Sequence, residues 1–267
     1  LLLNCFYNLV QLFRGLVQMP SYNCGQYLID SISSVQAQTY KNWELIVVDD
    51  CSTDGSWERL KKLCGSDSRI IPLKNDSNIG AALSRNRALR HAKGKWIAFL
   101  DSDDLWEPNK LEKQLAYMKQ ENISFSYSYY QEIDCSSKFT GVTVTGPKRV
   151  SYSDLLHYCW LGCLTVVYDA ESIGLVQIRD IRKNNCYAMW LEVGKKADCY
   201  LLPEVLAKYR RGRSGSVSSH SIFTMIGWHY KLWHEAENKN VIVSLWLTAV
   251  NLLFGFYKKV KYVKKIS

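Results

Sequence analysis

Short apolar runs alternate with amphipathic stretches along residues 16–104, and this alternation limits the fold more than any other feature of the chain. The apolar runs predict strands at 16–19, 44–48, 69–73 and 95–100. Apolar residues at helical spacing predict helices between these strands, at 27–38, 57–64 and 81–92. Strands that alternate with helices in this way form a mostly parallel sheet with helices packed on it. We therefore expect an α/β protein.

Acidic residues follow two of the predicted strands. Asp49 and Asp50 close the strand at 44–48, and three acids, Asp101, Asp103 and Asp104, follow the apolar run at 96–100. Clustered carboxylates repel one another, and burial raises their pKa values unless a cation neutralises them. Mg²⁺ or Mn²⁺ held by a few carboxylates keeps open positions for phosphate oxygens. The acids therefore predict a metal-bound diphosphate beyond the carboxyl ends of the strands, with Asp103, Asp101 and Asp104 as metal ligands.

Each acidic cluster also has a purely structural interpretation. Asp101, Asp103 and Asp104 could cap a helix that starts near Pro108, because acids are common at helix N-termini. The pair at 49–50 could simply form a strand-to-helix turn. The acids alone do not decide between these interpretations and a ligand site.

Composition narrows the class of protein and of partner. With 267 residues, 47% of them hydrophobic, the chain can bury the core of one large domain. The formal net charge of +9 is concentrated at 208–213 and 258–265, which favours a phosphorylated ligand or an anionic membrane surface over nucleic acid. Nine cysteines without CxxC spacing predict neither a disulfide framework nor a zinc site, and so a reducing compartment. The five histidines show no metal-ligand spacing, and we expect them to be structural or exposed.

Several sequence blocks in the first half of the chain resemble the family 2 glycosyltransferases of the GT-A fold. These blocks are Met19–Asn23, Gln38–Tyr40, Trp43–Asp54, Asn78–Gly80, Ser84–Asn86 and Phe99–Asp104. The similarity continues to Tyr209–Arg210, so it covers about residues 17 to 220. The relatives it suggests are bacterial transferases that build lipopolysaccharide, capsule or other surface glycans.

The resemblance implies a nucleotide-sugar donor, most simply a UDP-sugar, and a Mn²⁺ or Mg²⁺ ion. The donor-binding residues it implies are Pro20, Ser21, Tyr22, Asn23, Asp50, Asn78, Arg85, Asp101, Asp103 and Arg210. Among them, the loop at 20–22 and Asp50 are expected to hold uracil and ribose, and Asp101 and Asp103 the sugar and the metal. The basic residues Arg210, Arg211 and Arg213 could clamp the diphosphate or form a solvated loop.

The catalytic base is the point at which the sequence departs from this family. Inverting relatives carry an Asp just before an aromatic residue and a Trp-Leu pair, where this chain has Cys186. A thiol has an ordinary pKa near 8.5 and is a poor general base. Asp180 and Glu192 are the nearby acids that could compensate. Two functions stay open: a metal-dependent inverting glycosyltransferase, or an impaired GT-A domain that binds nucleotide-sugar or supports a partner.

The expected domain plan has an atypical segment at 1–15, a GT-A domain at 16–220 and a basic helical tail at 221–267. Within the domain, residues 16–114 form the nucleotide-sugar half and 115–220 the acceptor half. Residues 241–257 carry no charge and are followed by lysines, which predicts either an interfacial helix or a helix packed on the domain. Interfacial attachment predicts a cytoplasmic protein on the inner face of the membrane, acting on a glycan or lipid-linked acceptor.

Overall fold

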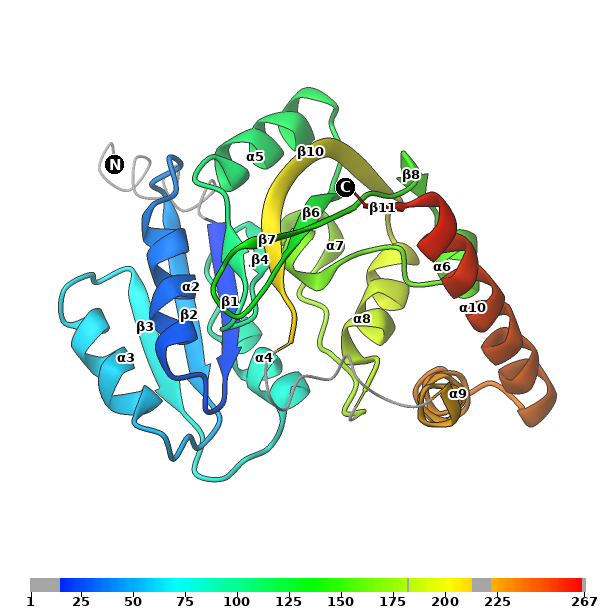
Figure 1. The fold of residues 1–267 in the computed structure, drawn as a ribbon, viewed down its shortest axis with the longest axis horizontal. Coiled ribbons are helices and arrows are strands. Elements are labelled where there is room, and N and C mark those ends of the chain that lie inside the picture. The colour runs from blue at the N-terminus through cyan, green and yellow to red at the C-terminus, as the bar shows by residue number, and fades with distance from the viewer. Residues whose placement is uncertain (1–14, 182, 213–221, 266–267) are drawn as a thin grey trace.

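The computed structural model describes residues 15–181, 183–212 and 222–265. Except for Gly15, the expected atypical segment at 1–15 lies outside the described residues. The described chain is a mixed α/β structure with a central sheet flanked by helices, as Figure 1 shows.

Four parallel strands form the first half of the sheet, in the order β3-β2-β1-β4. They are β1 (Gly15–Ser21), β2 (Trp43–Asp49), β3 (Ile70–Lys74) and β4 (Trp96–Phe99). These strands match the four that the apolar runs predict. The parallel part of the predicted sheet is therefore confirmed.

The second half of the sheet is mixed. Its path runs from β4 through β9 (Val167–Asp169), β6 (Phe125–Ile133) and β7 (Phe139–Val144) to β11 (Val263–Lys265), and each of these pairs is antiparallel. The long strand β10 (Cys199–Arg210) lies parallel to β6 and antiparallel to β5 (Leu105–Trp106) and β8 (Arg149–Val150). The sheet is thus parallel on the side where the acids were expected and mixed on the other.

Successive residues of the central strands face opposite sides, and each side has its own helices. Val17 and Leu45 belong to a core with helices α2 (Gln26–Gln36), α3 (Ser56–Cys64) and α5 (Lys110–Gln120). Leu16 and Ile46 belong to a second core with α4 (Ala81–Arg90), α6 (Tyr152–His157) and α8 (Asn185–Gly194). This alternation is what a two-residue strand period produces when both faces of a sheet are covered.

The C-terminal segment continues through α9 (Ile222–Lys231), the π-helix η2 (Leu232–Ala236) and α10 (Val241–Lys261) before it ends in β11. Leu232 and Trp233 are fully buried in the same core as α8. The segment after residue 221 is thus anchored in the core at η2 and joined to the sheet by the pairing of β11 with β7.

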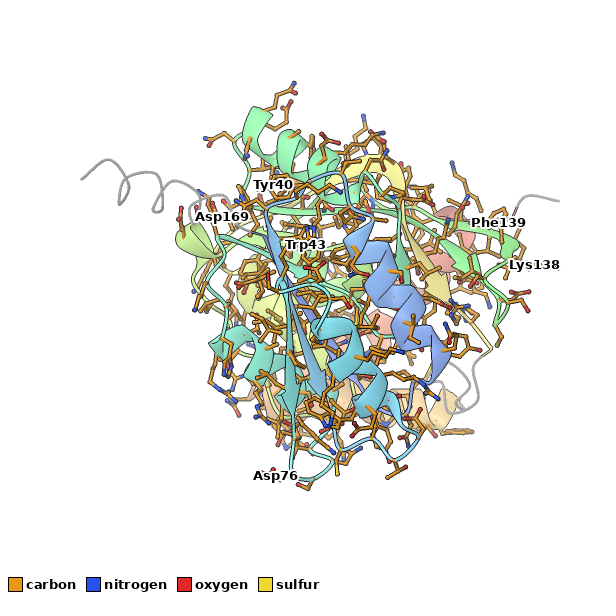
Figure 2. The ribbon with its side chains drawn as sticks, turned by 90° about the vertical axis from the view of Figure 1, so that its left-hand side faces the viewer. Tyr40, Trp43, Asp76, Lys138, Phe139 and Asp169 are labelled. Atoms are coloured by element: carbon orange, nitrogen blue, oxygen red, sulfur yellow. The ribbon has the colours of Figure 1, made fainter. Side chains whose placement is uncertain are left out.

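The carboxyl ends of the parallel strands lie at one edge of the sheet. In Figure 2, Trp43 at the start of β2 and Asp76 just after β3 lie toward opposite ends of the strands. The loops that follow β1, β2, β3 and β4 therefore meet at the edge near Asp76, where ligand sites of open α/β sheets are found.

Candidate functional site

The loops after β1 and β2 are joined by hydrogen bonds. The Asn23 backbone N–H donates to Ser52 Oγ at 3.0 Å, and the Thr53 N–H donates to Asn23 Oδ1 at 2.8 Å. Asn23 holds a left-handed conformation, with φ of 47°, which Asn adopts more readily than most residues. Tyr22 is 46% exposed beside it. The structure thus collects four predicted donor-binding residues at the end of β1: Pro20, Ser21, Tyr22 and Asn23.

Asp50 is buried and organises the loop that follows β3. Its carboxylate accepts hydrogen bonds from Asn75 Nδ2 at 2.8 Å and from the N–H groups of Ile79 and Gly80 at 2.9 and 2.8 Å. Asn78 lies in the same loop and is exposed. The sequence does not reveal that Asn75 donates to Asp50, because the position of Asn75 directly after β3 is the only local signal for this role.

Arg85 and Asp101 form a buried ion pair at the same edge. Arg85 lies on α4, and its side chain is 5% exposed, whereas that of Asp101 is 34% exposed. Burial alone would lower the pKa of Arg85, but the Asp101 carboxylate and other nearby groups raise it above its usual value. The pair fixes a permanent positive charge beside the first acid of the cluster.

The three acids after β4 do not come together as one metal-binding cluster. Asp104 is 1% exposed, and its Oδ1 accepts a hydrogen bond from the Arg210 backbone N–H at 2.8 Å. Burial, Asp103 and Asp101 raise the pKa of Asp104 well above its usual range. Among the described residues, no group of three or more His, Cys, Asp or Glu side chains is arranged to hold a metal ion. Asp104 is thus held against β10, and the assignment of all three acids as metal ligands stays a prediction.

Arg210 holds the site together instead of projecting from a loop. Its guanidinium donates to the backbone oxygens of Asp103 at 2.7 Å and Asp134 at 2.9 Å, and to Ser137 Oγ at 3.0 Å. The side chain is 2% exposed and lies over the Tyr27 ring, 4.5 Å from its centroid. Arg211 pairs with Glu132, and Arg213 lies outside the described residues. Arg210 therefore links the end of β10 to the loop after β4 that carries Asp103.

Cys186 lies in the first turn of α8, 3.3 Å from Cys163 Sγ. The contact with Cys163 lowers the pKa of Cys186; burial raises that pKa, and the Arg85 guanidinium lowers it. The pKa of Cys163 is raised by the same contact. A helix N-terminus and a nearby cation both favour a thiolate. Cys186 is therefore a more acidic thiol than its residue type predicts.

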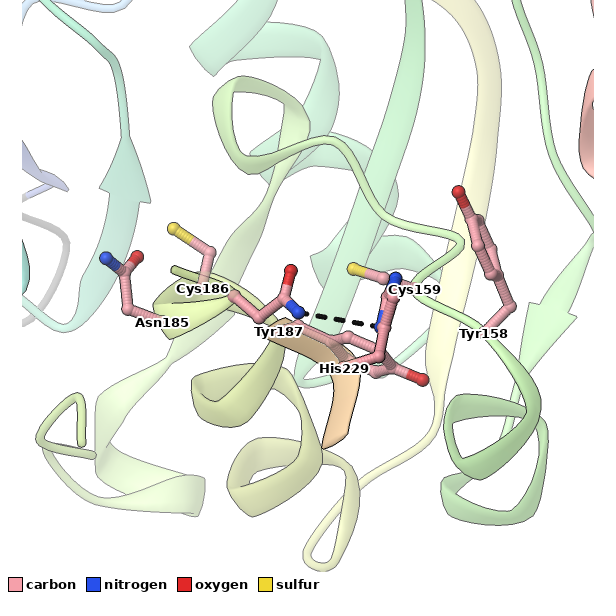
Figure 3. A pocket seen from close by; sticks show the side chains of 7 residues that line it. Tyr158, Cys159, Asn185, Cys186, Tyr187 and His229 are labelled. Atoms are coloured by element: carbon pink, nitrogen blue, oxygen red, sulfur yellow. Dashed lines mark hydrogen bonds between the residues drawn. The ribbon is translucent and has the colours of Figure 1, made fainter. Parts of the chain in front are cut away.

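A pocket of ≈ 290 Å³ opens beside Cys186, as Figure 3 shows. Its walls are Tyr158, Cys159, Asn184, Asn185, Cys186, Tyr187 and His229. His229 comes from α9, and its Nδ1 lies 3.5 Å from Asn184 Nδ2. Burial lowers the pKa of His229, which keeps the imidazole neutral at pH 7. The sequence analysis missed His229, because its pocket neighbours lie more than forty residues away in the chain.

The two acids proposed to compensate for Cys186 do not line this pocket. Glu192 forms ion pairs with Lys195 at 2.7 Å and Arg179 at 3.5 Å. It lies six residues beyond Cys186, which is about 9 Å along a helix. Asp180 is exposed in the segment before α8.

The match to a family model covers the strands and loops that build this edge. The model of glycosyl transferase family 2 matches residues 16–158. The putative teichuronic acid biosynthesis glycosyltransferase TuaG of Bacillus subtilis is 41% identical over 192 residues, which is 72% of this chain and 76% of that protein. The Escherichia coli UDP-Glc:alpha-D-GlcNAc-diphosphoundecaprenol beta-1,3-glucosyltransferase WfgD is 44% identical over 203 residues, 75% of this chain and 78% of that protein.

Solved structures agree on the fold. The S. aureus TarS fragment 1-349 in complex with UDP-GlcNAc superposes with a TM-score of 0.71 at 17% identity, covering 93% of this chain and 74% of that one. The mannosyltransferase PcManGT of Pyrobaculum calidifontis, in complex with GDP-Man and Mn²⁺, superposes with a TM-score of 0.62 at 14% identity. The superposition covers 91% of this chain and 75% of that one. The fold and the sequence similarity together identify this chain as a glycosyltransferase of family 2.

Proposed function

We propose that this enzyme transfers a sugar from a UDP-sugar to a lipid-linked or surface-glycan acceptor, with inversion and with the help of a divalent cation. The observation that carries the proposal is the meeting of three features at one edge of the sheet. These are the loop organised by Asp50, the Arg85–Asp101 pair and the pocket beside Cys186. A donor bound over the first two features would present its sugar toward the third, since Arg85 interacts with both Asp101 and Cys186.

We assign the cation to Asp103, with Asp101 beside it. Arg85 already neutralises Asp101, and Asp104 is buried against β10. Carboxylate oxygens at a partly exposed loop suit Mg²⁺ or Mn²⁺, which bind one or two carboxylates and leave positions for phosphate oxygens. The bound ion would neutralise charge on the leaving diphosphate. Asp50 would contribute through the loop it shapes and through the lone pairs that remain on its carboxylate.

The pocket beside Cys186 is the proposed acceptor site. An inverting transfer needs a group that takes the proton of the attacking hydroxyl. Cys186 stands where the family resemblance implies an Asp, and both Arg85 and the contact with Cys163 favour its thiolate. We propose that Cys186 takes this proton with lower efficiency than a carboxylate would.

Relatives supply the substrate classes in this proposal. The name of WfgD specifies UDP-Glc as donor and a diphosphoundecaprenol-linked sugar as acceptor. The name of the E. coli relative WfaP, 39% identical over 208 residues, specifies the same pair. Such an acceptor is held in a bilayer, so we propose that the chain works as a peripheral protein on the cytoplasmic face of the membrane.

A second function, donor binding without transfer, is supported by Cys186 itself. A thiol at the base position leaves the donor site intact and weakens the proton transfer. A domain of this kind would bind nucleotide-sugar or support a partner enzyme.

A transfer assay separates the two functions. Purified protein is incubated with radiolabelled UDP-sugars, a polyprenyl-diphosphate-linked sugar and Mn²⁺, and the lipid product is counted. We expect product from the wild type, and a loss of at least about 100-fold for Asp103→Asn, because the cation then loses its ligand. Glu121→Gln is the matched control, and it should keep wild-type transfer, because Glu121 is an exposed acid at the end of α5. Donor binding without product would favour the second function, and equal transfer by Asp103→Asn would refute the metal assignment.

A further inference from the structure

Helix α10 turns its polar residues inward and its apolar residues outward. Ser244, Thr248 and Asn251 are at most 4% exposed, whereas Ile242 and Phe256 are 80% and 72% exposed. The outward apolar face consists of Ile242, Leu245, Trp246, Leu253, Phe256 and Val260, whose positions all fall on one side of the helix. A helix that packs on a water-soluble protein has the opposite arrangement.

The orientation of α10 is fixed by specific contacts. Asn251 Nδ2 donates to the backbone oxygens of Leu156 and His157 at 3.2 and 2.8 Å. Lys258 Nζ donates to those of Cys159 and Trp160 at 3.2 and 2.9 Å. Because these hydrogen bonds all lie on the inward side, they fix the rotation of the helix and keep its apolar face turned toward the solvent.

Exposed apolar surface is concentrated on this helix. Of the fifteen large hydrophobic residues that are exposed in the described chain, nine lie on α10 and two on α9. Both helices lie at the end of the molecule opposite α3, as Figure 1 shows. A contiguous patch of this kind marks an interaction site.

The positive charge beside the outward apolar face indicates the kind of partner that this face binds. Four exposed lysines, Lys259, Lys261, Lys264 and Lys265, follow the apolar face, and residues 241–265 contain no acidic residue. Trp246 and Tyr257 are amphipathic aromatic residues of the type enriched at membrane–water interfaces. An apolar helix face with adjacent lysines matches the surface of an anionic lipid bilayer.

Within the described residues, α10 is the one helix long and apolar enough to cross a membrane, judged by length and composition. The contacts of the chain before and after α10 favour a helix that does not span the membrane. The π-helix η2 before it is anchored in the core by Trp233, and β11 after it pairs with β7. Both ends of α10 are thus held by the same body, which suits a helix that lies along a bilayer surface.

We propose that the outward face of α10 docks this enzyme on an anionic lipid bilayer, with the helix axis parallel to the surface. The proposal deepens the function proposed above and rests on its lipid-linked acceptor. Tyr158 connects the two sites, because it lines the pocket beside Cys186 and packs on Gly255 of α10, where an added Cβ would approach its ring to 3.0 Å. Docking through α10 would therefore place the pocket next to the lipid surface.

Vesicle flotation tests the docking face with the full chain. The probe is a vesicle of phosphatidylcholine mixed with phosphatidylglycerol, compared with phosphatidylcholine alone. We expect Trp246→Ser/Phe256→Ser to lower the bound fraction at least about tenfold on anionic vesicles. Lys259→Gln/Lys264→Gln should lower it most at low salt. The matched control, Phe139→Ser/Leu175→Ser, removes exposed apolar residues elsewhere and should bind like the wild type.

Two outcomes overturn the proposal. One is equal flotation of Trp246→Ser/Phe256→Ser and wild type. The other is a dimer in light scattering that the same substitution dissolves, without vesicle binding by the wild type, because the face would then bind a second copy. UDP binding measured in solution keeps the two proposals distinguishable, since the α10 variants should leave it unchanged. Vesicle binding without UDP binding would refute the proposed function and leave the docking face standing.

A separate observation concerns the sulfur atoms beside the pocket. Cys163 and Cys186 are 3.3 Å apart, and Cys186 lies on the pocket wall, where a small oxidant reaches it. Cys163 belongs to the single turn η1 (Cys163–Thr165), so a small shift of that turn brings the sulfurs to the length of about 2.05 Å that a disulfide requires. The lowered pKa of Cys186 supplies the nucleophilic thiolate.

We infer that hydrogen peroxide converts Cys163 and Cys186 into a reversible disulfide. The Cys186 thiolate attacks one peroxide oxygen, the O–O bond breaks, and hydroxide leaves to give a sulfenic acid. Cys163 sulfur then attacks Cys186 sulfur, so that the S–S bond forms, the S–O bond breaks and the oxygen departs as water with the thiol proton. The two thiols lose two electrons and the peroxide gains them. The disulfide would remove the thiolate from the acceptor pocket and reduce transfer.

Peptide mass spectrometry after peroxide treatment tests this pair. We expect a linked peptide that contains Cys163 and Cys186 and disappears with dithiothreitol. The link should be absent in Cys163→Ser and present in Cys135→Ser, which changes an exposed cysteine elsewhere. A Cys186 that pairs with Cys159 instead, or that oxidises to sulfinic acid without any link, would overturn the inference. The measurement does not depend on transfer activity.

Discussion

The proposed chemistry of this site depends most on Cys186. Its surroundings suit an acid–base group: the first turn of a helix, the Cys163 sulfur at 3.3 Å and the buried cation Arg85. An Asp at the same position would be ionised at neutral pH, because its ordinary pKa lies near 4, and the Arg85 cation would favour its charged form as well. The site therefore keeps an environment that suits the Asp of its relatives.

Restoring that Asp is expected to increase transfer. Cys186→Asp should raise kcat at pH 7.5 by about tenfold or more, since a well-placed general base contributes about 10²- to 10⁴-fold. The measurement is the radiolabel transfer assay, with Cys135→Asp, at an exposed site, as the matched control. Unchanged or lower transfer by Cys186→Asp, with UDP binding intact, would show that another group takes the proton.

Lys110 predicts a pH dependence of stability. It is fully buried at the start of α5, where its Nζ donates to the Thr165 backbone oxygen at 3.2 Å. Burial lowers its pKa from 10.5 to about 7. Between these values the unfolded chain binds more protons at this residue than the folded one, so its contribution to stability rises with pH.

The difference in the free energy of unfolding between the wild type and Lys110→Met isolates the contribution of Lys110 from those of the Tyr and Cys groups. Between pH 7 and pH 9, we expect the free energy of unfolding of the wild type to rise by about 2 kcal/mol more than that of the variant. Urea denaturation at both pH values measures it. Lys113→Met, at a half-exposed lysine of the same helix, should show no such change. A flat difference for Lys110→Met would mean that Lys110 stays protonated in the fold.

Sequence patterns reveal functional residues only where the signal is local. The acids at 49–50 and 101–104 are evident in the sequence because they follow apolar runs. The structural role of Arg210 is not evident in the sequence, because its partner Asp104 is 106 residues away. Asn75 and His229 were missed for the same reason, since their partners come from other loops and helices.

At the scale of elements, helical periodicity predicts that α10 forms but leaves the buried face open. Ser244, Thr248 and Asn251 share one face, and the sequence left open whether the helix lies at a membrane interface or packs on the domain. The structure places protein there, because backbone oxygens at the end of α6 need donors and Asn251 supplies them. A polar stripe can thus mark the buried side of a helix whose partner is a set of carbonyl groups.

Removing this donor should loosen α10. Asn251→Ala leaves the oxygens of Leu156 and His157 without their side-chain donor, at a cost of about 1 to 3 kcal/mol in the free energy of unfolding. Urea denaturation gives the energy, and hydrogen exchange of α10 amides gives its location. Asn109→Ala is the control, because Asn109 caps α5 without a side-chain hydrogen bond. Wild-type protection of α10 in Asn251→Ala would contradict this account.

At the scale of the whole molecule, the parallel half of the sheet could be predicted and the mixed half could not. Strands β1 to β4 are adjacent in sequence and separated by amphipathic helices, so their order follows from general rules of connection. Strands β6 and β7 form a local hairpin, but the pairs β4–β9 and β7–β11 join strands that are far apart in the sequence; Val144 of β7, for example, pairs with Val263. Such pairings depend on the completed fold.

The proposed transfer depends on coupling between the nucleotide and the cation at the loop after β4. Asp103 should hold the ion, and the ion should hold the diphosphate, so each ligand should tighten the binding of the other.

Isothermal titration of UDP with and without Mn²⁺ measures this coupling most directly. For the wild type and for Glu121→Gln, we expect Mn²⁺ to strengthen UDP binding at least about tenfold, and for Asp103→Asn less than about twofold. UDP affinity that is the same with and without Mn²⁺ in the wild type would contradict the central claim.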